Sequence, residues 1–148
     1  MIKKIAVAFI AVVLLSACSS SRGKHTAHSG NSLIAEFERT IGDRVFFKYD
    51  SADLTTEAQT TLKRQAEWLK NHPSFNLTVE GHCDERGTRE YNIALGERRA
   101  NSVKSFLTKH GITAERVDMI SYGKERPAVV GDDEAAFNQN RRGVTALR

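Results

Sequence analysis

The hydrophobic period of the chain changes near its middle, and this change constrains the fold more than any other feature. From Phe75 to His82, apolar and polar residues alternate, which is typical of a strand with one buried face. From about Glu90 to His110 the apolar residues recur at helical spacing, at Ile93, Ala100, Val103 and Leu107. A strand that leads into a long helix indicates a domain that mixes helices with a sheet.

Further segments fit the same architecture. Four of residues 45–49 are β-branched or aromatic, and residues 117–122 and 143–147 are further strand candidates. A second helix is expected after Thr55, its N-cap, and the run ends before Pro73. We therefore expect an α/β sandwich (α+β) in which two long helices pack on one face of a mixed sheet of about four strands.

The N-terminal end is not expected to belong to this domain. Two lysines precede a continuous apolar run from Ile5 to Leu15, which is shorter than the roughly 18 to 20 residues that span a bilayer. This pattern predicts a secretion signal over residues 1–17. The segment Leu15-Ser16-Ala17-Cys18 resembles the bacterial lipobox, and this resemblance implies cleavage before Cys18 and acylation of that cysteine, which would tether the protein to a membrane.

The chain after the signal divides into a tether and one domain. Residues 18–32 are rich in Ser, Gly and His and lack an apolar period, so we expect a flexible tether that begins at the lipidated cysteine. Ser19 implies sorting to the outer membrane, by analogy with such lipoproteins. Residues 33–148 are expected to form a single domain, because roughly 115 residues suffice for one hydrophobic core.

The segment between the central strand and the following helix, residues 81–88, holds the residues that are most informative about ligand binding or catalysis. A strand that ends in this glycine-flanked loop places Asp84 at the rim of the sheet, and Asn92, Leu95 and Arg99 share one face of the helix. Asp84 and Arg99 can therefore approach each other. They form either a plain ion pair or a site for a free amino-acid centre, whose ammonium Asp84 would receive and whose carboxylate Arg99 would bind.

The same segments resemble a known family. Residues 79–88 (VEGHCDERGT), 90–93 (EYNI) and 95–101 (LGERRAN) are similar to the peptidoglycan-associated lipoproteins, whose folded part is an OmpA-like domain. The likeness extends from about Val45 to the C-terminal end, through the NRR segment at residues 140–142. Because the matches are long, ordered and without gaps, the resemblance is specific.

The resemblance implies a periplasmic domain that binds the meso-diaminopimelate of peptidoglycan stem peptides and does not cleave it. The resemblance implies that such a domain needs no cofactor and no metal. By motif position, Asp84 would bind the ammonium and Arg99 the carboxylate. Asn92 and Leu95 would form the pocket wall or would only contribute to helix packing. Phe47 and Lys48 would offer backbone contacts, although Lys48 stands where the family commonly has an acid.

The resemblance also implies a place in the cell. An outer-membrane lipoprotein of this kind links that membrane to the cell wall, and its domain faces the periplasm. Its partners would be peptidoglycan and the Tol proteins, notably TolB, in the system that maintains the envelope and serves cell division.

Two other classes of function are weighed against this one. An enzyme could use Cys83 as a nucleophile with His82 or His110 as its base, and a metal could bind His82, Cys83 and Asp84. Neighbours in a strand point to opposite faces, so these side chains are badly placed to act together, and Cys83 is expected to be a buried apolar residue. A net charge of +4, with basic residues interleaved with acidic ones, argues against a nucleic-acid partner.

Overall fold

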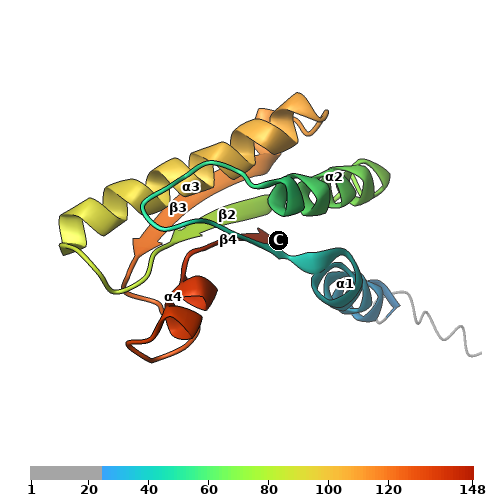
Figure 1. Ribbon diagram of the computed structural model, residues 1–148. Helices are drawn as coiled ribbons and strands as arrows, with labels where there is room; N and C mark the ends of the chain where they lie inside the picture. The colour runs from blue at the N-terminus through green and yellow to red at the C-terminus, as the bar shows by residue number, and fades with distance from the viewer. Residues whose placement is uncertain (1–24) are drawn as a thin grey trace, which may run out of the picture.

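The computed structural model describes residues 25–148, which form a four-stranded sheet with two long helices on one of its faces (Figure 1). The strands are β1 (Arg44–Phe46), β2 (Leu77–His82), β3 (Val117–Gly123) and β4 (Arg142–Leu147). Their order is β1-β4-β2-β3. Strand β4 is antiparallel to both of its neighbours, and β2 and β3 are parallel. The predicted mixed sheet and α+β class are confirmed.

The two long helices, α2 (Thr56–Asn71) and α3 (Arg89–Lys109), begin at side-chain caps. Thr55 accepts a hydrogen bond from the backbone N–H of Ala58 at 3.1 Å, and Thr88 caps α3 in the same way. Each cap satisfies one of the N–H groups that a helix start leaves free. After α3 the chain turns at Gly111, whose φ of 94° lies in the left-handed region.

The core lies between the sheet and these two helices. Its fully buried side chains include Leu62, Leu69, Leu77, Val79, Val103 and Leu107. The apolar stripe predicted for α3 is therefore correct for its C-terminal part. It is wrong for Ile93, which is 37% exposed, because Ile93 lies beside Gly123, where β3 and the sheet end.

Helix α3 approaches β2 unusually closely. A Cβ atom added at Gly81 would lie 1.8 Å from the carbonyl oxygen of Gly96, so the two backbones meet where these glycines face each other. Only residues without a side chain allow this contact. It brings the N-terminal half of α3 against the end of β2, where the segment of chemical interest begins.

Four further elements were not predicted. Helix α1 (His25–Glu36) runs into the π-helix η1 (Phe37–Gly42), and a short 3-10 helix, η2 (Ala114–Arg116), precedes β3. Helix α4 (Glu134–Asn140) follows β3. The sequence predicted a flexible tether as far as Ser32, whereas the structure begins α1 at His25. The physical reason lies just beyond α1, where the buried Phe37 packs on Trp68 and fixes the end of this segment on α2.

The predicted secretion signal, the lipidated Cys18 and the first part of the tether lie outside the described residues. Within residues 25–148, no helix is both long enough and apolar enough to cross a membrane.

Candidate functional site

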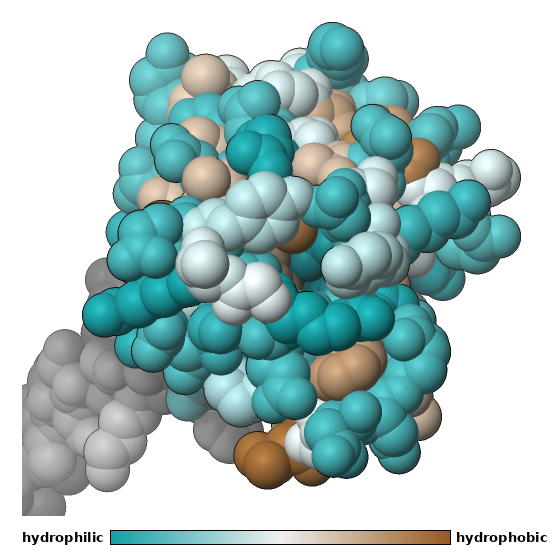
Figure 2. Space-filling model, turned by 60° about the vertical axis from the view of Figure 1, so that its left-hand side comes forward, coloured by the Kyte–Doolittle hydropathy of each residue, from teal (hydrophilic) through white to brown (hydrophobic). Residues whose placement is uncertain are grey.

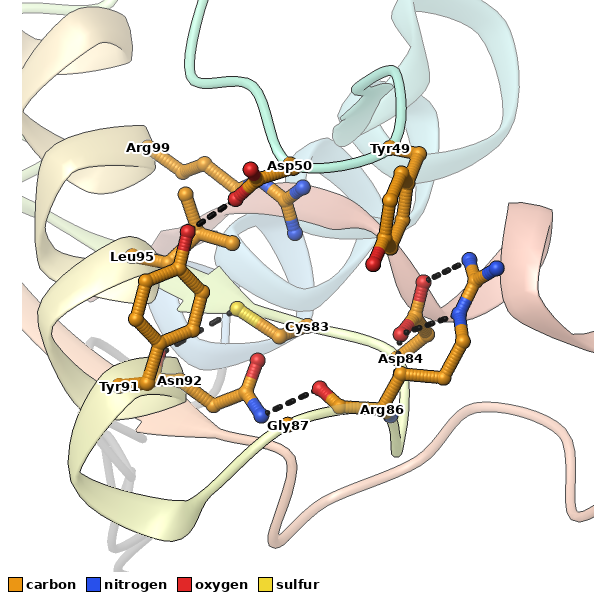
Figure 3. A pocket seen from close by; sticks show the side chains of 10 residues that line it. All are labelled: Tyr49, Asp50, Cys83, Asp84, Arg86, Gly87, Tyr91, Asn92, Leu95 and Arg99. Atoms are coloured by element: carbon orange, nitrogen blue, oxygen red, sulfur yellow. Dashed lines mark hydrogen bonds and ion pairs between the residues drawn. The ribbon is translucent and has the colours of Figure 1, made fainter.

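A cavity of about 130 Å³ lies at the end of the sheet where β2 leads into α3 (Figure 3). Three segments form it: the loop after β1, the loop after β2, and the first turns of α3. This end of the molecule is turned forward in Figure 2, where the surface is hollowed and some hydrophobic atoms are visible inside the hollow, among hydrophilic side chains. The lining residues are Tyr49, Asp50, Cys83, Asp84, Arg86, Gly87, Tyr91, Asn92, Leu95 and Arg99.

Arg99 forms a buried positive floor of the cavity, with an exposed fraction of 0%. Its guanidinium donates hydrogen bonds to three backbone carbonyl oxygens: Ser51 at 2.8 Å, His82 at 2.8 Å and Lys48 at 3.1 Å. No carboxylate of residues 25–148 lies within ion-pair distance of it. Burial lowers the pKa of Arg99 from its ordinary value. The site therefore holds a buried cation with which no carboxylate of the described residues forms a direct ion pair.

Asp84 is the acidic wall of the cavity and is 4% exposed. One of its oxygens accepts from the backbone N–H and Nε of Arg86, at 3.1 and 3.2 Å. The other accepts from Nη2 of Arg86 at 2.6 Å and from Nη1 of Arg141 at 3.2 Å. Burial acts to raise the pKa of Asp84, but these hydrogen bonds from Arg86 and Arg141 outweigh it and hold that pKa below its ordinary value.

The structure thus brings Asp84 and Arg99 to the same cavity but does not pair them. The hypothesis of a plain ion pair between them is wrong, because the partners of Asp84 are Arg86 and Arg141. All four lone-pair positions of the Asp84 carboxylate are occupied by these donors.

Asp50 supplies a second carboxylate, which sequence reasoning did not assign to the site. The hydroxyl of Tyr91 donates a hydrogen bond to one of its oxygens, across the mouth of the cavity (Figure 3). Asp50 is also the one residue other than glycine in the described part of the chain with a positive φ, 52°. A backbone held in this sparsely populated region often marks a functional site.

Of the other four predicted site residues, two line the cavity and two do not. Asn92 and Leu95 are buried and line the cavity, and the Asn92 amide donates to the carbonyls of Arg86 and Thr88, which fixes the loop. Phe47 and Lys48 do not line it. Their carbonyl oxygens hold Arg141 and Arg99 instead.

Cys83 and His82 point in different directions, as the strand period predicts. Cys83 lines the cavity and its thiol donates to the carbonyl of Asn92 at 3.3 Å, whereas the His82 ring lies against Tyr122. Burial raises the pKa of Cys83, although Arg99 acts in the opposite direction. A thiol with a raised pKa and no adjacent base is a poor nucleophile. In residues 25–148 no group of three or more His, Cys, Asp or Glu residues is placed to hold a metal ion.

The sequence of the chain matches the model of the OmpA family over residues 46–141. The peptidoglycan-associated lipoprotein of Agrobacterium fabrum is 54% identical over 112 residues, which are 76% of this chain and 63% of that protein. The chain therefore spans less than two thirds of that relative's length. The peptidoglycan-associated lipoprotein of Mesorhizobium japonicum is 44% identical over 152 residues, which are 95% of this chain and 89% of that protein.

Solved structures agree with these relatives. The crystal structure of the peptidoglycan-associated lipoprotein from Burkholderia pseudomallei has a TM-score of 0.72 and 36% sequence identity, and the match covers 75% of this chain and 96% of that one. The C-terminal domain of Helicobacter pylori MotB has a TM-score of 0.67 with 20% identity, over 72% of this chain and 84% of that one, and shares the fold alone.

Proposed function

The chain belongs to the OmpA family and, within it, to the peptidoglycan-associated lipoproteins, and from this premise we propose that it binds peptidoglycan through the free end of meso-diaminopimelate. That end of the stem peptide carries an ammonium and a carboxylate on one carbon. The family is structural and not enzymatic, which agrees with the sequence prediction. Binding therefore holds the wall without cutting it.

The observation that carries this proposal is the buried Arg99. An ion transferred from water into a protein interior costs several kcal/mol unless its charge is compensated. The three backbone carbonyls supply dipoles but no negative charge. Three of the five N–H groups of Arg99 serve them, so two N–H groups are not used by these carbonyls, and Arg99 lines the cavity. A carboxylate matches these donors in both charge and planar geometry.

The ammonium of the ligand would lie at the acidic wall. Asp84 remains the residue implied by the family motif, but its four hydrogen bonds leave it little capacity for a further donor. Asp50 lies on the same cavity, is exposed, and its side chain is engaged by Tyr91. We therefore expect the ammonium between the two carboxylates, with Asp50 offering the open oxygen.

The cellular role follows from the family and from the predicted lipobox. An acylated Cys18 would anchor the chain in the outer membrane, and the domain would hold the wall from the periplasmic side. TolB and the other Tol proteins are the partners that the resemblance implies in envelope integrity and cell division.

The proposal is tested by sedimentation of the protein with purified peptidoglycan sacculi and by titration with meso-diaminopimelate. Asp50→Asn and Asp84→Asn each remove one negative charge, and Arg99→Gln removes the positive one. Loss of one partner of a desolvated charge pair costs about 2 to 5 kcal/mol, so at least a thirtyfold weaker binding is expected for Arg99→Gln.

The matched control is Asp53→Asn, which removes the same charge from the same loop outside the cavity. It is expected to bind like the unmodified chain. Circular dichroism separates a lost contact from a lost fold, which matters for the fully buried Arg99. Wild-type binding by a folded Arg99→Gln variant would refute the assigned role of the arginine.

A further inference from the structure

We infer that Tyr49 and Tyr91 form an aromatic gate that binds the aliphatic stalk by which the zwitterionic centre is attached to the rest of its ligand. The inference rests on the proposed function, because it assumes that the zwitterionic centre binds at Arg99 and the acidic wall of the cavity. It adds a second chemical class of contact, between aromatic rings and methylene groups, and assigns it to two residues.

The two rings stand on opposite sides of the mouth (Figure 3). Tyr49 comes from the loop after β1 and Tyr91 from the first turn of α3, and both line the cavity. They are 61% and 45% exposed, respectively. Large rings that stay in solvent beside a cavity are typical of surfaces that bind a ligand.

A charged group holds each ring in place. The hydroxyl of Tyr91 donates to Asp50, which ties the tip of that ring to the opposite loop. The guanidinium of Arg86 lies over the Tyr49 ring at 4.1 Å and over the Phe137 ring at 4.3 Å, and Asp84 fixes that guanidinium. Rings that are already ordered lose little conformational entropy when a ligand packs between them.

The size of the cavity decides which part of a ligand meets these rings. The cavity measures about 130 Å³ and opens to solvent, so it is too small for a whole stem peptide. The chain that leads away from a centre bound at Arg99 must therefore leave through the mouth, between Tyr49 and Tyr91. Methylene groups gain free energy by burial against such rings, whereas a charged stalk would lose hydration there.

The test is a series of free D-amino acids with one head and a growing unbranched stalk: D-alanine, D-norvaline and D-norleucine. Dissociation constants are measured by chemical-shift titration of the full-length chain in mild detergent. For the unmodified chain, each added methylene is expected to tighten binding, by up to about fourfold where it is fully buried. Tyr49→Ala and Tyr91→Ala are expected to flatten this dependence, whatever happens to the overall affinity.

Tyr91→Phe is the matched control. It loses the hydrogen bond to Asp50 but keeps the ring, so the dependence on stalk length is expected to persist whatever happens to the overall affinity. Both tyrosines are exposed, and thermal unfolding of each variant verifies that the fold is retained.

The outcomes separate the gate from the function on which it rests. If the unmodified chain binds D-alanine and D-norleucine equally, or if the alanine variants keep the dependence, the gate is wrong while the charged site stands. If neither the amino acids nor sacculi bind, the proposed function falls together with the gate. If N-acetylglucosamine dimers shift the two tyrosines and stalk length has no effect, the rings are a sugar platform and the gate is again overturned.

Discussion

At the scale of single residues, His82 connects the site to the opposite face of the sheet. Its backbone carbonyl accepts a hydrogen bond from Arg99, while its ring is buried. Nε2 of the ring lies 3.3 Å from a carboxylate oxygen of Glu80, and Nδ1 has no hydrogen-bond partner in the described residues. Burial, together with the charges of Arg142 and Arg126, lowers the pKa of His82 to about 4. The ring is therefore neutral in the folded protein at neutral pH.

This buried ring predicts a loss of stability in mild acid. The unfolded chain takes up a proton on His82 below its ordinary pKa of 6.5, whereas the folded protein does so only near 4. The contribution to stability is thus fully present above pH 6.5 and is lost as the pH falls toward 4. Between pH 7.5 and pH 5 the free energy of unfolding should fall by about 2 kcal/mol from this residue.

Urea denaturation at the two pH values measures the effect, with His82→Gln as the variant that cannot titrate. The decrease should be smaller in His82→Gln by about the same 2 kcal/mol. Asp84 does not interfere, because its lowered pKa makes it titrate below 3.8, outside this pH range. Equal decreases in both proteins would mean that His82 is not protonated on unfolding.

At the scale of elements, the contact between α3 and β2 sets the position of the site. The helix supplies Asn92, Leu95 and Arg99, and the strand leads into Asp84. Because the two backbones meet with no side chain between them, this contact sets how closely the helix that carries Arg99 approaches the strand that leads into Asp84.

Gly81→Ala is expected to lower the free energy of unfolding by about 3 kcal/mol or more, since the added Cβ would meet backbone 1.8 Å away and α3 would have to move. Binding to sacculi should fall with it. Gly30→Ala in α1 is the control, because nothing lies within 4 Å of its Cβ, and it should raise stability by up to about 1 kcal/mol. Urea denaturation compares the two variants, and similar values for both would contradict the close contact.

At the scale of the whole molecule, the segment that leads toward the N-terminal end is packed on the domain. The ring of Phe37 is fully buried, at 5.0 Å from the ring of Trp68. Farther along, the amide of Gln65 donates to the carbonyl of Gly42 at 2.6 Å, and its carbonyl oxygen accepts from Thr145 on β4 at 2.9 Å. If Cys18 is anchored in a membrane, these contacts would transmit a mechanical force on the N-terminal segment to the sheet.

Phe37→Ala is therefore expected to cost about 3 to 5 kcal/mol of stability, the usual effect of deleting a buried phenylalanine. The comparison variant is Val130→Ala, at a side chain that is 92% exposed, where a change within about 0.5 kcal/mol is expected. Denaturant midpoints measure both. If Phe37→Ala unfolds at the same midpoint as Val130→Ala, the N-terminal segment is not part of the cooperative unit.

Sequence reasoning succeeded where a local pattern carries the information. The two-residue period of β2 and the helical period of α3 reflect which side chains are buried, so both elements were predicted close to their observed ends. Helix α4 was missed, because its seven residues are too short to repeat a period. The start of α1 was missed because the residues at its beginning carry no apolar period that marks a helix.

The sequence by itself determined the two long helices, the strands and the presence of Asp84, Asn92, Leu95 and Arg99 on one strand–loop–helix unit, because that unit is local in the chain. Only the tertiary structure decided their partners. Asp84 is bound by Arg141, 57 residues away, and Tyr91 reaches Asp50 across 41 residues. The carbonyls that hold the buried charge of Arg99 come from two segments far apart in sequence, and no local pattern in the sequence records such a meeting.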